Sequence, residues 1–252
     1  MDRTGARSRP RGRRALWVVL ALVVSAVVAV SVLLPAYPAD RTAEAALADP
    51  PAGVTVVADA DAITLVPTGR PRSGLVFQPG ARVDARAYGP ILMPVAQSGH
   101  LVVIVRQPLG IGFLAIDKPR QVMGAHPEIE QWTLGGHSLG GVAAAQYLST
   151  DPQGADKLLL WASYPAGSLA DLTTLEVASI GGEQDPMVTP AQLEESRANL
   201  PPGASITIVP GAIHAHFGDY GTQAGDGNAT VDRAQAQAAI VAASLALLEE
   251  TA

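Results

Sequence analysis

Residues 134–142 read Leu-Gly-Gly-His-Ser-Leu-Gly-Gly-Val, and this stretch decides the fold. Its serine, Ser138, has a glycine two positions before it and another two positions after it, Gly136 and Gly140. This spacing is typical of a nucleophile elbow, a sharp turn between a strand and a helix that strains the serine backbone and crowds both flanking positions. The pattern therefore predicts that the hydroxyl of Ser138 is exposed at the edge of a sheet.

The residues around the motif distinguish an elbow from an ordinary Gly/Ser turn, which is a real alternative in a chain with 25 glycines. Residues 131–134 have the character of a short strand, and residues 142–148 are good helix formers. The order strand, turn, helix is the context that an elbow requires, and it favours that interpretation.

From about residue 53, short β-rich runs alternate with helical stretches, which predicts a mostly parallel eight-stranded sheet with helices on both faces. The predicted strands are 54–57, 63–66, 74–77, 101–105, 131–134, 157–161, 177–180 and 205–209. The predicted helices are 84–96, 118–124, 139–148, 190–199 and 230–248. We expect the first of these to be short or kinked because Pro90 and Pro94 interrupt it. Thr189, Pro190 and Gln192 predict a capped start for the helix at 190.

The amino terminus predicts a membrane anchor. Residues 15–34 carry neither a charge nor a proline, and as a helix they are long enough to span a bilayer. The basic tail at 1–14 contains six arginines, so the positive-inside rule keeps it cytoplasmic and places the remainder outside the cytoplasm. A signal peptide, cleaved to release a secreted protein, is the alternative, but its apolar region should be shorter. Twin-arginine export and a nucleic-acid-binding tail are weaker alternatives.

Composition limits the rest of the chain to one ordinary α/β domain. Residues 35–52 are proline-bracketed and are interpreted as a spacer, which leaves 53–252 for the domain. The sequence has no cysteine, which excludes disulfides and thiolate nucleophiles. The net charge is −6 even with the arginine tail included, so the domain itself is acidic and is not expected to bind nucleic acid. His214 and His216 lack a third ligand, so no metal is predicted.

A serine hydroxyl becomes a good nucleophile only when a histidine takes its proton and a carboxylate orients that histidine. Asp185 lies in the loop after the seventh predicted strand, and His214 lies in the loop after the eighth. The chain order Ser, Asp, His is the one expected for an elbow serine on an α/β sheet. Glu183 or Asp171 as the acid, and His216 as the base, remain alternatives.

With these motifs the chain resembles the α/β-hydrolase superfamily, most closely its small members with little or no cap, related to dienelactone hydrolases. The resemblance covers about residues 54–250 and rests on the elbow, on Gly182-Glu183-Gln184-Asp185 and on Gly211-Ala212-Ile213-His214. It implies Asp185 and His214 as partners of Ser138. It also implies an oxyanion hole made by the amide of Leu139 and by a second amide in the loop 78–81. Pro79 has no N–H, so that second donor is expected to be Ala81.

The remaining histidines and the paired acids receive structural interpretations. His137 is expected to point away from Ser138, and His100 and His126 are expected at the surface or in packing. Asp59 and Asp61 read as a solvated turn. About 12 residues separate the sixth and seventh predicted strands, too few for a helical cap, so the site is expected to be open.

The sequence thus predicts a serine hydrolase that cleaves a small ester-like carboxylic substrate through an acyl-enzyme, without a metal or an organic cofactor. Activity is expected to rise as His214 loses its proton. A membrane-tethered binding module without turnover, and acyl transfer by the same residues, remain as alternatives. The oligomeric state is left open.

Overall fold

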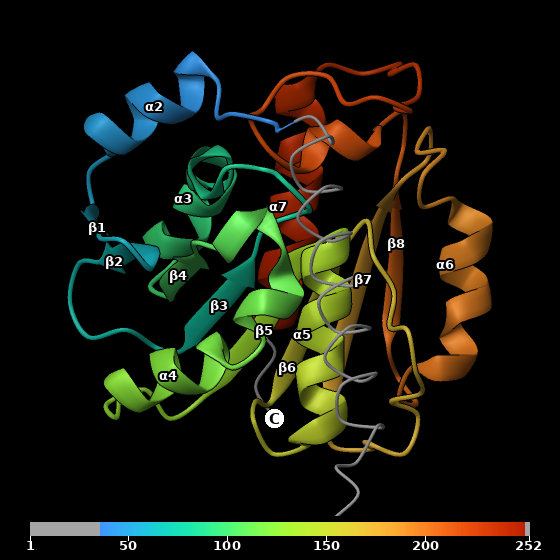
Figure 1. The fold of residues 1–252 in the computed structure, drawn as a ribbon, viewed down its shortest axis with the longest axis horizontal. Coiled ribbons are helices and arrows are strands. Elements are labelled where there is room, and N and C mark those ends of the chain that lie inside the picture. The colour runs from blue at the N-terminus through green and yellow to red at the C-terminus, as the bar shows by residue number, and fades with distance from the viewer. Residues whose placement is uncertain (1–35, 250–252) are drawn as a thin grey trace, which may run out of the picture. The chain divides into compact units, whose positions relative to one another are not determined.

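The computed structural model describes residues 36–249, in which eight strands form one sheet (Figure 1). Their order across the sheet is β1-β2-β4-β3-β5-β6-β7-β8. The strands are β1 (Val54–Ala58), β2 (Ala62–Pro67), β3 (Gly74–Gln78), β4 (Leu101–Val105), β5 (Trp132–His137), β6 (Lys157–Trp161), β7 (Glu176–Gly182) and β8 (Ser205–Val209). All eight predicted strands are present.

The sheet is mixed rather than uniform in direction. Strands β4, β3, β5, β6, β7 and β8 run parallel, whereas β2 is antiparallel to both β1 and β4. The short turn between β1 and β2 requires these two strands to be antiparallel, because parallel neighbours need a crossover of a dozen residues or more. The prediction of a mostly parallel sheet therefore holds for the six strands from β3 onward.

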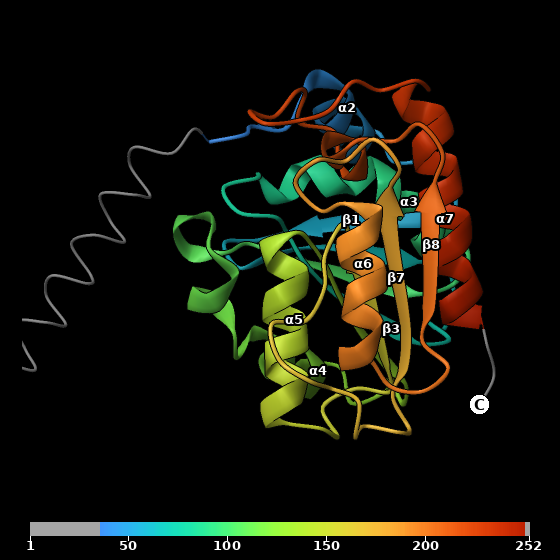
Figure 2. The ribbon, with the colours of Figure 1, turned by 90° about the vertical axis from the view of Figure 1, so that its right-hand side faces the viewer.

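Helices cover both faces of the sheet. They are α2 (Arg41–Ala48), α3 (Gly89–Gln97), α4 (Lys118–Ala125), α5 (Leu139–Thr150), α6 (Pro190–Ser196) and α7 (Arg233–Glu249). Leu75 and Phe77 of β3 pack in one core with α3 and α7, while Val76 packs in the other with α5. Successive side chains of a strand point to opposite faces, so α5 and α7 lie on opposite sides of the sheet (Figure 2). Because both faces are covered, β3 to β6 are buried along their whole length.

The predicted helix over 84–96 is divided in two just before Pro90, whereas Pro94 lies inside the second part without ending it. A short 3-10 helix at Ala85–Tyr88 is followed by α3, and Pro90 lies in the first turn of α3, where a missing N–H costs little. The predicted capping box is also present at α6, where Gln192 N donates to Thr189 Oγ1 and Thr189 N donates to Gln192 Oε1.

The interpretation of 35–52 as a spacer is corrected over the part that the structure describes. Asp40 caps α2 by accepting a hydrogen bond from Ala43 N at 3.0 Å, and Ala43 is completely buried. Arg233 at the start of α7 contacts the carboxylate of Asp40 at 2.7 Å. The alanine-rich segment therefore folds as a helix and packs on the domain, because an apolar face and a cap outweigh the flanking prolines.

The predicted basic tail at 1–14 and the predicted anchor at 15–34 lie outside the described residues. Within residues 36–249, no helix combines the length and the apolar character needed to cross a bilayer.

One buried hydrogen bond fastens α7 to the sheet and gives a test of this architecture. Trp161 of β6 is fully buried, and its indole N–H donates to Ser244 Oγ of α7 at 2.9 Å. We expect Ser244→Ala to lower the free energy of unfolding by about 1–3 kcal/mol, because the indole N–H then lacks a partner in the core. Urea unfolding of the full chain measures this.

The control is Ser149→Ala at the exposed end of α5. It removes a hydroxyl that donates to the carbonyl of Gln146 in the same helix. That change is expected to stay within about 0.5 kcal/mol of the wild type. Equal effects of the two substitutions would contradict the assigned role of the Trp161–Ser244 bond.

Candidate active site

The turn between β5 and α5 holds Ser138 in a strained conformation. Its φ is 52° and its ψ is −124°, a region that residues other than glycine rarely occupy. A Cβ on Gly136 would collide with the backbone of Gly140, and a Cβ on Gly140 would collide with the carbonyls of Gln78 and Pro79. The turn thus has the strained serine and the crowded glycines that a nucleophile elbow requires. Ser138 itself is half-buried.

The loops after β7 and β8 bring Asp185 and His214 together. His214 Nδ1 and Asp185 Oδ2 lie 2.7 Å apart, and both side chains are fully buried. The other oxygen of Asp185 accepts hydrogen bonds from the amides of Met187 and Val188, which fixes the carboxylate. Since a carboxylate accepts, Nδ1 of His214 carries the proton, and Nε2 presents a lone pair in the neutral ring.

Nε2 of His214 is buried and has no hydrogen-bond partner within residues 36–249. The hydrogen bonds of that part of the chain do not include one from Ser138 to His214. The link between the two is His137, which precedes Ser138 and whose ring centroid lies 4.5 Å from that of His214. The structure therefore joins two of the predicted residues directly and places the third beside a ring that contacts His214.

The loop after β3 contains the second oxyanion donor predicted from the sequence, and most of its amides are engaged or absent. Pro79 has no N–H, the amide of Gly80 donates to Tyr88 Oη at 2.9 Å, and the amide of Arg82 donates to Gly110 O. Among the residues that the structure describes, the amide of Ala81 has no hydrogen-bond acceptor. Leu139 begins α5, so its N–H also lacks an intrahelical acceptor.

The alternative acid and base residues have other roles. Glu183 accepts a hydrogen bond from Gly211 N at 2.9 Å, and this bond stabilises the turn after β8. Asp171 is exposed in the connection between β6 and β7. His216 is buried beside His214 in the short helix at His214–Phe217, and burial lowers its pKa.

The structure also shows the contacts of the residues that were predicted to have structural roles. His100 is buried and bonds Ser73 Oγ at 2.9 Å, and His126 is half-buried beside Glu128. The carboxylate of Asp59 accepts hydrogen bonds from two amides of the β1–β2 turn.

No sequence pattern indicated that His137 and Tyr88 are in contact beside the elbow. His137 is 1% exposed, its Nδ1 lies 2.9 Å from Tyr88 Oη, and its ring stacks on Phe217. Burial lowers the pKa of His137 well below its usual value, and the charge that His214 can carry lowers it further. Tyr88 is 49 positions away along the chain, and no sequence spacing links it to the elbow.

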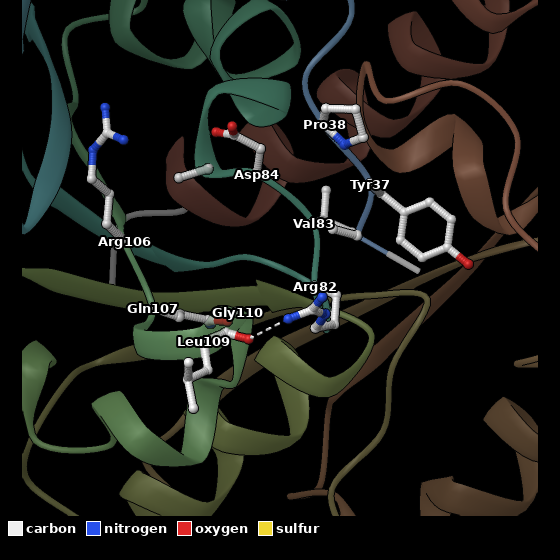
Figure 3. A pocket seen from close by; sticks show the side chains of 11 residues that line it. Tyr37, Pro38, Arg82, Val83, Asp84, Arg106, Gln107, Leu109 and Gly110 are labelled. Carbon is white, nitrogen blue, oxygen red and sulfur yellow. Dashed lines mark hydrogen bonds between the residues drawn. The ribbon is translucent and has the colours of Figure 1, made fainter. Parts of the chain in front are cut away.

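Two further features bear on where a substrate could bind, the connection between β6 and β7 and a nearby surface cavity. The connection at 162–175 contains no helix, in line with the predicted lack of a cap between β6 and β7. A cavity of about 360 Å³ lies between segments 36–38, 82–85 and 106–110, where the guanidinium of Arg82 reaches Leu109 O (Figure 3). Ser138 does not line this cavity. In residues 36–249, no cluster of three or more His, Asp or Glu side chains is arranged to hold a metal ion.

Solved structures share this fold at low sequence identity. A dienelactone hydrolase from Anabaena variabilis has a TM-score of 0.60 and 14% identity, over 78% of this chain and 97% of that one. Est1E from Butyrivibrio proteoclasticus has a TM-score of 0.56 and 11% identity, over 79% of this chain and 100% of its own. A predicted CIB-like hydrolase from Thermoplasma acidophilum has a TM-score of 0.54 and 16% identity, over 64% and 90% of the two chains.

No curated protein matches the chain. The model of the "Alpha/beta hydrolase family" matches residues 74–238, a span that runs from β3 into α7 and contains the elbow and the Asp185–His214 pair. The chain therefore belongs to the α/β-hydrolase family.

Proposed function

We propose that the protein is a serine hydrolase that cleaves an ester-like carboxylic substrate through an acyl-enzyme. Ser138 Oγ attacks the carbonyl carbon while His214 Nε2 takes the hydroxyl proton, and the same proton then passes to the departing alcohol. Water, activated by His214 in the same way, hydrolyses the acyl-enzyme and restores the serine. Asp185 holds the imidazole in the required tautomer throughout.

The observation that carries this proposal is the buried Asp185–His214 pair, in which Nε2 of His214 has no hydrogen-bond partner within residues 36–249. With Nδ1 engaged by Asp185, the free lone pair at Nε2 is what a general base requires. Strain at Ser138 supports the same conclusion, because unfavourable backbone angles concentrate at active sites.

The amides of Leu139 and Ala81 complete the proposed chemistry as oxyanion donors. The uncapped β6–β7 side favours small or exposed acyl groups as substrates. The apolar segment 15–34 and the arginines before it support a domain anchored in the membrane and facing out of the cytoplasm, with secretion after signal cleavage as the alternative.

The first test replaces the nucleophile. We expect Ser138→Ala to lower kcat on simple esters by about 10⁴-fold or more and to abolish labelling by a fluorophosphonate, because no other group then forms the acyl-enzyme. Ser149→Ala, on the same helix but exposed, is the matched control and should be labelled normally. A folded wild type that neither hydrolyses esters nor reacts with the probe would indicate the binding module instead. Transfer of the acyl group from Ser138 to an added alcohol in place of water, which forms a new ester, would indicate acyl transfer.

The second test separates the two acids after β7. Asp185→Asn should lower kcat by about 10³ to 10⁴-fold, because an amide cannot hold His214 in the tautomer that presents a lone pair at Nε2. Glu183→Gln keeps an oxygen that accepts from Gly211 N, and its activity should stay close to the wild type. Steady-state kinetics on one ester measures both variants, and the opposite ranking would assign the acid to Glu183.

A further inference from the structure

Three side chains and one amide form a buried chain of contacts beside the proposed nucleophile. Gly80 N donates to Tyr88 Oη at 2.9 Å, and Tyr88 Oη lies 2.9 Å from His137 Nδ1. The ring of His137 in turn packs against that of His214, with centroids 4.5 Å apart. These contacts connect the loop after β3, which carries Ala81, with the elbow and with the proposed base.

The direction of the hydrogen bonds follows from what each group can donate. The phenol oxygen of Tyr88 accepts from Gly80, and its own hydrogen has one described acceptor, His137 Nδ1. Nδ1 of His137 is therefore unprotonated, and the ring hydrogen lies on Nε2. The hydroxyl of Tyr88 thus sets the tautomer of His137.

Burial keeps this chain of contacts uncharged. Tyr88 is completely buried and His137 is 1% exposed, so burial raises the pKa of the phenol and lowers the pKa of the imidazole. A charge on His137 would repel the positive charge that His214 gains when it takes the serine proton. A neutral neighbour at 4.5 Å leaves His214 able to accept that proton.

At Gly80, the loop after β3 packs directly against the side chains of His137 and Tyr88. A Cβ at this position would lie 2.8 Å from His137 Nδ1 and 3.1 Å from Tyr88 Oη. Ala81 follows directly, so the position of its amide depends on how Gly80 is held. One hydroxyl therefore bonds the loop that carries a proposed oxyanion donor and the histidine that contacts the proposed base.

We propose that Tyr88 and His137 are positioning residues, which hold the oxyanion loop and a neutral imidazole against His214 without touching the substrate. This proposal rests on the proposed hydrolase function, which it extends by two residues. It assigns to His137 a role that its position inside the elbow does not by itself reveal.

The test is Tyr88→Phe in the full chain, which removes one oxygen and keeps the buried ring. We expect kcat for ester hydrolysis to fall about 10- to 100-fold, less than the loss of an oxyanion donor itself, with KM changed by less than about twofold. Tyr147→Phe is the matched control, since it removes a hydroxyl that bonds Asp151 Oδ2 at 3.0 Å on α5. Thermal unfolding of both variants accompanies the kinetics.

A spectroscopic measurement does not depend on activity. Nitrogen-15 NMR of the histidine rings, assigned with His137→Gln, should show His137 protonated at Nε2 alone, and Tyr88→Phe should shift its Nδ1 resonance. Protonation at Nδ1 in the wild type would overturn the proposal. So would a Tyr88→Phe variant with the kcat of the wild type, or an equal loss in Tyr147→Phe.

The two proposals fail in different ways. A wild type without hydrolysis or fluorophosphonate labelling refutes the hydrolase function and with it the positioning role, even if the NMR tautomer is the expected one. An active wild type with an equally active Tyr88→Phe variant refutes only the positioning role.

Discussion

The close contact between the start of α5 and the end of β3 is the constraint on which the rest of the site depends. A side chain at position 140 would clash with the carbonyls of Gln78 and Pro79. A side chain at position 141 would clash with that of Ser163. Ser163 Oγ in turn donates to the carbonyl of Ser138 at 2.8 Å. Three strands are thus locked around one turn, and this packing compensates the unfavourable backbone angles of Ser138.

The buried sheet explains why polar chemistry gathers at one edge. Strands β3 to β6 are buried along their whole length, so they offer almost only apolar side chains and ladder hydrogen bonds. Polar side chains are accommodated where the strands end and the backbone turns. The loops after β3, β5, β7 and β8 leave the carboxyl ends of parallel neighbours, and they therefore converge. Backbone bonds such as Gln184 N to Ala212 O at 2.8 Å fasten the last two loops to each other.

Electrostatics at this edge depends on keeping most groups neutral. The proposed base lies among aromatic rings and a second imidazole, and burial lowers the pKa of His137 and raises those of Tyr88 and Tyr220. A region of low dielectric strengthens the bond between Asp185 and His214 and penalises any additional charge nearby. Nearby carboxylates are paired with a cation, since Arg233 at the start of α7 contacts Asp40, the cap of α2, and the buried Asp219.

Local patterns in the sequence determined the elements. Apolar runs predicted all eight strands, Pro90 predicted the break at the start of α3, and the glycine spacing predicted the strained turn at Ser138. The loop positions of Asp185 and His214 also followed, because the ends of parallel strands meet at one edge. Only the tertiary structure decided the packing of α2, the antiparallel pairing of β2 with β4 and the contact between Tyr88 and His137. These depend on which side chains meet across long stretches of chain, and periodicity within a short window carries no information about such distant partners.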